Sequence, residues 1–272
     1  MRWINSRPSS GMRLALASLP FAALLIAYTV GSTARLAENA NDKLLPGLAG
    51  FAEAINRLAF IPDPRTGDIL LVSDTVASLI RLFSGLGIAT LIALTLGMLI
   101  GMLPYARSAL SAFVAAICMV PPLALLPILF IALGLGEVSK IALIVIGVAP
   151  VMVRDLAFKA IELPREQIIK AETLGGNSWQ IALRVVLPQI LPRLITCLRL
   201  QLGPAWLFLI AAEAISSDSG LGYRIFLVRR YLSMDVIFPY VVWITLIAVL
   251  TDFLLDRLRR AVFPWDVLEG KA

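Results

Sequence analysis

The sequence predicts an all-α membrane protein with about six transmembrane helices, and three observations support that prediction. Of the 272 residues, 59% are hydrophobic and 15% charged, whereas a soluble domain is typically about 45–50% apolar and about 25% charged. The mean hydropathy is +0.88. Uncharged runs of about 20 residues, the length that a helix needs to cross a bilayer, recur along the chain. The lipid bilayer is therefore the expected solvent.

Three uncharged runs predict spans directly, at residues 14–34, 82–106 and 108–136. The third run ends at Glu137 and is long enough to tilt or bend. The first run also resembles the apolar part of a secretory signal peptide, but it is longer than such a region and several spans follow it. We therefore predict that the first run is a retained helix.

Three further spans are predicted from runs that contain or border charge, at residues 141–153, 194–217 and 236–255. The fifth span carries Arg199 and Glu213. Because charge at membrane depth is costly, such side chains usually face a bundle interior or a water-filled path. These spans are therefore the place to look for functional residues.

Six spans put both termini on one side of the membrane. That side carries 15 Lys and Arg residues and the other side 9, and the richer side is expected to be cytoplasmic. The predicted organisation is an N-terminal cytoplasmic segment with the first helix (1–35), an external segment of short interfacial helices (36–80), a core of five transmembrane helices (81–264) that includes a cytoplasmic loop (158–192), and a cytoplasmic tail (265–272).

Residue types that the sequence lacks exclude several kinds of site. With no histidine, the chain has no imidazole catalysis, no Ser-His or Cys-His pair and no His-ligated metal. No G-x-x-x-x-G-K-[ST] motif for ATP occurs; the only Gly-Lys pair is Gly270-Lys271. Cys118 and Cys197 lie in apolar stretches and are expected to act as small hydrophobes. We predict no catalytic residue, metal or cofactor, and the net charge of +6 reflects membrane orientation rather than nucleic-acid binding.

The most informative segment, residues 160–192, is too polar to cross a membrane. Pro164 suits the first turn of a helix, and Gly175-Gly176 is expected to end that helix because glycine adopts the left-handed conformation freely. Between them, a narrow apolar stripe with intervals of three is formed by Ile168, Ala171 and Leu174. The segment therefore begins with a short amphipathic helix that a glycine turn ends.

A second helix is predicted directly after the turn. Asn177 suits the N-cap, and Gln180 completes something close to a capping box. An apolar face of helical period follows, formed by Trp179, Leu183, Val186 and Leu187. Pro188 and Pro192 are expected to end this helix before the fifth span. The pair of helices predicts a docking surface; a lipid-bound hairpin is the weaker alternative, because glutamates interrupt the basic pattern that anionic headgroups favour.

This loop resembles the EAA loop of ATP-binding-cassette (ABC) importer permeases, roughly E-A-A-x-x-x-G, nine residues, then I-x-L-P. Ala171 matches the second alanine, Gly175 the glycine, Val185 the isoleucine, and Leu187-Pro188 the closing pair. Ile169 and Lys170 replace the glutamate and the first alanine, so the name-giving acid is absent. The resemblance implies docking on a separate ATPase subunit, through Ala171, Thr173, Leu174, Gly175, Gly176, Trp179, Val185, Leu187 and Pro188.

Residues 119–140, 173–192 and 210–225 look like one branch of these permeases, that of the nitrate, sulfonate, taurine and bicarbonate importers. The resemblance extends from about Leu79 to Pro264. It implies the fold of type I importer permeases (MetI-like), in a bacterial inner membrane with both termini cytoplasmic. The implied partners are two copies of the ATPase, a second copy of the permease, a periplasmic solute-binding protein and the lipid bilayer.

Two features of the spans are candidates for the solute pathway. Pro121-Pro122, midway along the third span, is expected to kink it, and either lines the pathway or makes a packing bend. Glu213 lies among small residues that allow close helix approach, and a carboxylate inside a membrane is a functional candidate. It either contacts solute or is a buried structural partner of Arg199, fourteen residues earlier.

A polar, glycine-rich turn follows the fifth span at residues 216–223. It is either part of an external gate, formed by Ser219, Gly220, Gly222 and Tyr223, or a connecting loop. At the other end of the sixth span, a cluster of acids and arginines at residues 252–260 is explained by i, i+4 pairing and by membrane anchoring.

The predicted function is solute import by alternating access, driven by a separate ATPase. The branch implies a small anion as solute, while the final third also resembles permeases for urea- or guanidine-type nitrogen compounds; both stay open. The alternative is a secondary transporter, which would show internal repeats and more ionisable residues in the membrane. An intramembrane enzyme would need a catalytic set that the sequence does not offer.

Overall fold

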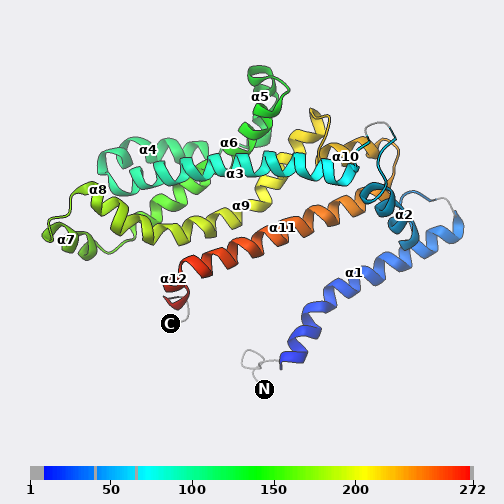
Figure 1. Ribbon diagram of the computed structural model, residues 1–272, viewed down its shortest axis with the longest axis horizontal. Coiled ribbons are helices and arrows are strands. Elements are labelled where there is room, and N and C mark those ends of the chain that lie inside the picture. The colour runs from blue at the N-terminus through cyan, green and yellow to red at the C-terminus, as the bar shows by residue number, and fades with distance from the viewer. Residues whose placement is uncertain (1–8, 40–41, 65–66, 270–272) are drawn as a thin grey trace.

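The computed structural model describes residues 9–39, 42–64 and 67–269, and every regular element in these ranges is a helix (Figure 1). Residues 1–8 and 270–272, which the sequence analysis assigns to the N-terminal segment and the tail, lie outside the described residues. The α-helices are α1 (Ser10–Glu38), α2 (Leu48–Ala59), α3 (Leu70–Met102), α4 (Pro104–Ile117), α5 (Leu126–Leu133), α6 (Glu137–Ile161), α7 (Arg165–Thr173), α8 (Ser178–Ile181), α9 (Leu187–Ile215), α10 (Leu221–Arg229), α11 (Met234–Val262) and α12 (Pro264–Glu269). Two short turns complete them, the 3₁₀ turn η2 (Pro122–Leu125) and the π-helical turn η3 (Ala182–Val186).

The centre of the bundle is the contact between α3 and α6. The two helices run parallel, and a row of residues spaced four apart on α3 faces a matching row on α6. The rows are Gly85, Ala89, Ala93, Gly97 and Gly101 on α3, and Ile144, Val148, Met152, Leu156 and Ala160 on α6, all buried. A Cβ atom at Gly85 would stand 2.8 Å from Cβ of Ile144, and one at Gly97 would stand 2.8 Å from Cβ of Leu156. Small residues on α3 therefore allow the backbones to approach closely.

Helix α9 packs on the other side of α6, where the Phe208 ring fills the space that a side chain at Gly147 would need. Helices α10 and α11 cover α9. The buried core continues through these helices with Ala205, Leu209 and Tyr240, each 1% exposed or less. The five helices α3, α6, α9, α10 and α11 therefore form one packed unit.

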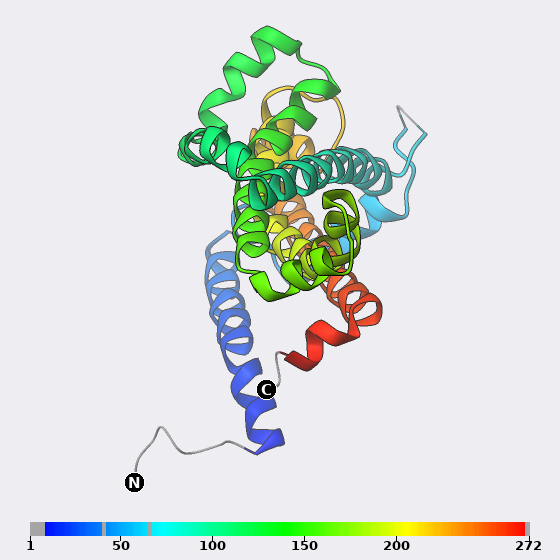
Figure 2. The same ribbon diagram turned by 90° about the vertical axis from the view of Figure 1, so that its left-hand side faces the viewer.

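Helix α1 diverges from this unit toward its N-terminal end (Figures 1 and 2). Its C-terminal end is attached: the Tyr28 hydroxyl donates to the Pro46 carbonyl at 2.7 Å, and the ring contacts Phe51 and Phe238. Beyond the helix, Asp42 accepts hydrogen bonds from the backbone N–H of Leu44 and from Arg35, which hold the pKa of Asp42 below its usual range. Most of the apolar surface of α1 is exposed, as expected for a helix surrounded by lipid or by another membrane subunit.

The predicted fold class is confirmed in number and type of spans. Within the described residues, five helices are long and apolar enough to cross a membrane, and the pair α4 and α5 makes a sixth if it counts as one broken span, bent by 83°. The bend confirms the kink expected at Pro121-Pro122, which lie between the two helices. Because proline has no backbone N–H and its ring clashes with the preceding turn, two in succession interrupt the helix.

The helix that contains the second predicted span begins earlier than that span. Helix α3 begins at Leu70, whereas the span was predicted from Leu82, so residues 70–80 of the predicted external segment are helical and continuous with the span. The charges that ended the predicted run are accommodated because Asp74 and Arg81 are buried and paired with groups from other helices.

The prediction that Pro188 and Pro192 end the loop helix is also wrong. The helix continues without a break over Ser178–Ile215. The π-helical turn η3 explains this, since the N–H of Leu187 donates to the carbonyl of Ala182, five residues earlier, immediately before the residue that lacks a donor. The loop is thus joined to the fifth span by continuous helix.

Candidate functional site

Two regions at opposite ends of α3 are candidates (Figure 1). The first is the α7–α8 corner, residues 173–180, where the loop resembles the EAA motif. The second is the polar cluster, made by side chains of four helices, all buried or half-buried except Glu137, which is exposed: Asp74, Ser78, Arg81, Glu137, Lys140, Glu213 and Arg224. Both regions contain residues that the sequence singled out.

In the α7–α8 corner, the two glycines end α7 as predicted. Gly175 has a φ of 82°, in the left-handed region, and its N–H donates to the Glu172 carbonyl at 2.9 Å. The N–H of Gly176 donates to the Ala171 carbonyl at 2.9 Å. These are the two hydrogen bonds of a Schellman motif. A Cβ atom at Gly176 would stand 2.8 Å from that same carbonyl oxygen, so the two glycines are required for different reasons.

The start of α8 is capped as predicted. The Asn177 side chain accepts from the N–H of Gln180 at 2.8 Å, and the Gln180 side chain accepts from the N–H of Asn177 at 3.1 Å. On the other side of the turn, the Thr173 hydroxyl donates to the Lys170 carbonyl at 2.8 Å. Each end that meets at the corner therefore has its hydrogen bonds satisfied locally.

The side chains at the corner divide into an inner and an outer set. Ile181, Val186 and Ile190 are buried and pack against the end of α6. Leu174 and Trp179 point outward, with 87% and 71% of their surfaces exposed. The expected apolar face of the second helix is therefore split. Ala171, Val185, Leu187 and Pro188 are half-buried, and of the motif-matching residues Gly175 lies at the exposed surface.

An apolar groove of about 600 Å³ lies beside the corner. Met98 and Met102 of α3 form part of one wall, and Trp179 and Leu183 part of the other. The corner thus offers an exposed apolar knob on a rigid backbone, next to an apolar hollow.

In the polar cluster, Glu213 is fully buried and accepts hydrogen bonds from three groups. Its carboxylate lies 2.7 Å from the Ser78 hydroxyl, 2.7 Å from Nη1 of Arg81 and 2.8 Å from the backbone N–H of Gly222. A Cβ atom at Gly220 would stand 2.5 Å from the carboxylate. The glycine-rich turn therefore wraps around Glu213, and its glycines are needed for that approach.

The alternative pairing of Glu213 with Arg199 is wrong. Arg199 donates to Asp252 at 2.8 and 2.9 Å and also binds Asp256, both on α11. Fourteen residues of α-helix separate Arg199 from Glu213 by roughly 21 Å, so a shared helical face does not bring them together. Glu213 is nevertheless a paired buried carboxylate, with Arg81 as its cation.

Arg81 and Lys140 connect Glu213 to the start of α6. Arg81 binds Glu137 with two hydrogen bonds of 2.5 and 2.9 Å and donates to the Ser219 carbonyl at 2.7 Å. Lys140 lies 2.9 Å from the same Glu137 carboxylate and 3.2 Å from the Ser217 hydroxyl. The side chains of Arg81 and Lys140 are 6% and 4% exposed, whereas that of Glu137 is 55% exposed.

Asp74 forms the second half of the cluster. It accepts from Arg224 at 2.8 Å, from the Tyr240 hydroxyl at 3.0 Å and from the backbone N–H of Gly220 at 3.0 Å. Asp74 and Arg81 are seven residues apart on α3 and therefore share a helical face. This face was not predicted, because the second span was predicted to begin only after Arg81; the helical spacing of Asp74, Ser78 and Arg81 was the available signal.

The remaining sequence candidates lie apart from these contacts. Pro121 is exposed and Pro122 half-buried at the bend before α5. Tyr223, on α10, is half-buried, and its ring lies 5.7 Å from the guanidinium carbon of Arg224. Of the predicted gate, Ser219, Gly220 and Gly222 contact the polar cluster through their backbone groups.

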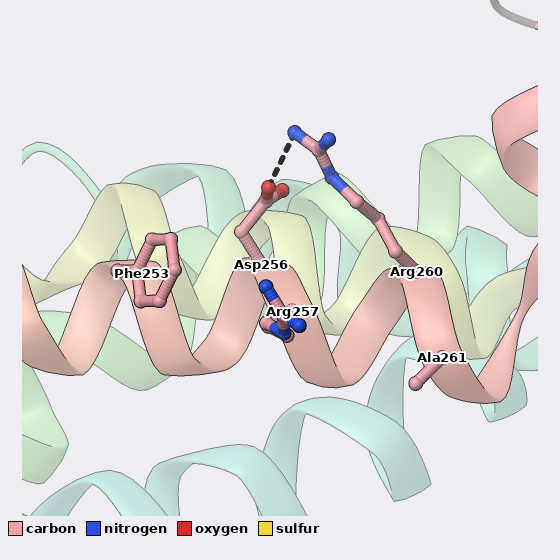
Figure 3. Close-up of a pocket in the computed structure, with 5 residues that line it drawn as sticks. All are labelled: Phe253, Asp256, Arg257, Arg260 and Ala261. Atoms are coloured by element: carbon pink, nitrogen blue, oxygen red, sulfur yellow. Dashed lines mark ion pairs between the residues drawn. The ribbon is translucent and has the colours of Figure 1, made fainter.

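A smaller hollow of about 440 Å³ lies along one face of α11, at positions i, i+3, i+4, i+7 and i+8 (Figure 3). It is lined by Phe253, Asp256, Arg257, Arg260 and Ala261. Asp256 binds Arg260 at 2.6 Å, the predicted i, i+4 pair. Because Asp256 also binds Arg199, the group ties α9 to α11 and serves packing.

Residues 85–265, more than half of the chain, match the model of the family described as binding-protein-dependent transport system inner membrane component. The chain belongs to this family. The taurine transport system permease protein TauC of Escherichia coli is 36% identical over 200 residues, 73% of this chain and 72% of TauC. The bicarbonate transport system permease protein CmpB of Synechococcus elongatus is 30% identical over 189 residues, 69% of this chain and 68% of CmpB.

The solved structure of the MetNI methionine ABC transporter, in inward-facing conformations, contains a similar chain. The two are 25% identical with a TM-score of 0.62, over 71% of this chain and 96% of that one. The predicted MetI-like fold and the nitrate, sulfonate, taurine and bicarbonate branch are thus confirmed. The protein is a multi-pass permease of an ABC importer, and its relatives are permease subunits rather than enzymes.

Proposed function

We propose that the permease imports a small solute of the kind carried by its relatives, using an ATPase that docks on the α7–α8 corner. The observation that supports this most is the exposure of Leu174 and Trp179, at 87% and 71%, on a corner whose backbone is fixed by a Schellman motif and a capping box. Exposed apolar side chains on a rigid support are typical anchors of protein interfaces.

The corner is suited to transmit motion as well as to bind. Helix α8 continues through η3 into α9, which carries Glu213. The buried residues Ile181, Val186 and Ile190 join the same continuous helix to the end of α6. A displacement of the corner by an ATPase would therefore reach two central helices without crossing a flexible linker.

The orientation follows from the charge count. We assign both termini and the α7–α8 corner to the cytoplasm of a bacterial cell with an inner membrane, since that side carries 15 of the Lys and Arg residues. The polar cluster then lies toward the outside. A periplasmic solute-binding protein would deliver solute there, and a second permease copy would complete the pathway, as for the importers that its relatives belong to.

A secondary transporter without an ATPase is the less well supported alternative. One relative is described as a taurine transport system permease and another as a probable ABC transporter permease, and the matching family is that of binding-protein-dependent transport systems. An exposed apolar corner on a loop would also have no partner in a transporter that works alone.

Replacing Gly175 by valine tests the proposal. A β-branched side chain in the left-handed region costs about 1–2 kcal/mol, so the corner should change while the bundle still inserts. We expect Gly175→Val to remain in the membrane, to lose most of its ATPase in a pull-down and to abolish uptake.

The matched control is Gly67→Val. Gly67 also has a left-handed φ, of 76°, and open space around it, but it lies in the loop before α3. It should keep its ATPase and its uptake. Full ATPase binding and normal uptake by Gly175→Val would refute the coupling role of the corner.

A further inference from the structure

Arg81 of α3 and Lys140 of α6 are both buried, but the carboxylate that they share is not. Arg81 and Lys140 expose 6% and 4% of their side chains, and Glu137, which both bind, exposes 55%. Solvent therefore reaches this pair of cations at the place that the Glu137 carboxylate fills. The free energy needed to move such a carboxylate from its cations into water is much lower than for a buried carboxylate.

Glu213 provides the contrast within the same cluster. It is fully buried, accepts from Arg81, Ser78 and Gly222, and is enclosed by the glycine turn, so it has no path to water without unfolding that turn. One carboxylate is thus a fixed partner of Arg81, and the other occupies an exposed position on the same guanidinium.

We propose that Arg81 and Lys140 form a binding site for the anionic group of a singly charged oxyanion, which the Glu137 carboxylate occupies in its absence. The proposal rests on the proposed function for one point, that the ligand is the imported solute. A sulfonate, a carboxylate or bicarbonate carries the required group.

The charge balance favours a single negative charge. With Glu137 in place, two cations face two carboxylates. When Glu137 turns to solvent, the buried group keeps one net positive charge, which one monoanion neutralises. Asp74 and Arg224 balance each other and do not alter this count.

The geometry favours an oxyanion over a spherical ion. Nε and Nη2 of Arg81 both donate to the Glu137 carboxylate, and this parallel pair of donors matches two oxygens of a carboxylate or sulfonate. Nζ of Lys140 donates to one of the same oxygens and also lies 3.2 Å from the Ser217 hydroxyl. A neutral urea or a guanidinium cation would not replace Glu137 at these donors.

The test measures binding of methanesulfonate to the purified full-length permease in detergent at constant ionic strength. If Glu137 occupies the site at least four-fifths of the time, its removal should tighten the apparent Kd about five-fold or more. We therefore expect Glu137→Gln to bind methanesulfonate at least about five-fold more tightly than the wild type. Dimethyl sulfone, a neutral molecule of the same shape, should not bind.

Two variants separate binding from general effects of charge. Glu53→Gln makes the same charge change at an exposed position on α2 and should leave the Kd unchanged. The double variant Glu137→Gln/Lys140→Met keeps the cluster neutral, so it should fold, and it should lose the gain in affinity. An unchanged Kd in Glu137→Gln, or equally tight binding by the double variant, would overturn the proposal.

This measurement needs no ATPase, so it is independent of the test at Gly175. Tight binding by Glu137→Gln together with an intact ATPase complex in Gly175→Val would leave the anion site standing and remove the coupling role. An unchanged Kd in Glu137→Gln together with loss of the ATPase in Gly175→Val would remove the anion site and support the coupling role. Binding of methanesulfonate without uptake of any sulfonate, carboxylate or bicarbonate by the whole transporter would contradict the assignment of the ligand as solute.

Discussion

The α7–α8 corner and the polar cluster lie at opposite ends of α3 and use polar groups in opposite ways. In the corner, backbone amides and one capping pair make the hydrogen bonds, and apolar side chains such as Leu174 project outward. In the cluster, charged side chains make the bonds and are withdrawn from solvent, as Glu213 is. A site built from backbone hydrogen bonds can change its exposed side chains freely, whereas a site built from buried charges cannot.

The comparison predicts the largest loss of stability in the cluster, at Glu213→Gln. Arg81 would lose the charge of its buried partner, and breaking a buried ion pair from one side costs about 3–5 kcal/mol. Thermal unfolding of the detergent-solubilised permease should show this as a large fall in Tm and in folded yield. Glu53→Gln, on the surface of α2, is the control and should match the wild type.

Wild-type stability in Glu213→Gln, with changed transport, would mean that Glu213 contacts the solute and is not mainly structural. In that case the polar cluster, like the α7–α8 corner, would serve binding more than stability.

A smaller loss is expected at Gly222→Ala. A Cβ atom there would stand 2.8 Å from the Ile210 carbonyl oxygen and 3.0 Å from Cβ of Glu213, so overpacking should cost about 1–3 kcal/mol. Gly203→Ala, on the same helix as Glu213 and with open space around it, should instead raise stability by about 0.5–1 kcal/mol. Equal Tm values for the two variants would show that the turn does not enclose the carboxylate tightly.

The smallest effect on stability is expected at Leu174→Ala. Its side chain is 87% exposed, so the free energy of unfolding should change by less than about 0.5 kcal/mol. ATPase binding, by contrast, should weaken roughly tenfold if Leu174 is an interface anchor. Leu48→Ala, an exposed leucine at the start of α2, should leave ATPase binding unchanged. A loss of stability with normal ATPase binding would reverse the roles of the two regions.

Local features explain why the corner was predictable. A Schellman turn and a capping box depend on residues within a few positions of each other, such as Gly175, Asn177 and Gln180. The signals therefore lie in the sequence itself, and the structure has both. The loop pattern did not indicate that the helix continues past Pro188. That continuation depends on the π-helical turn η3, which joins α8 to α9 and has no signature in the loop pattern.

The cluster was only partly predictable, because its partners are distant in sequence. Glu213 was identified as a carboxylate at membrane depth, but its cation, Arg81, lies 132 residues away and was taken as the charge that precedes the second span. Pairing between helices is decided by which faces meet. A single sequence carries little trace of it.

The sequence by itself determined the membrane class, the number of spans, the glycine turn with its caps, and the ABC permease resemblance, because these depend on composition, on run length and on short local patterns. Only the tertiary structure decided that α3 extends back to Leu70, that Arg199 pairs with α11, and that Glu137 shares Arg81 with Glu213. Each of these depends on contacts between charged side chains of different helices, and the first and third depend on the burial of Arg81. Burial becomes favourable only when another helix supplies the opposite charge at hydrogen-bonding distance.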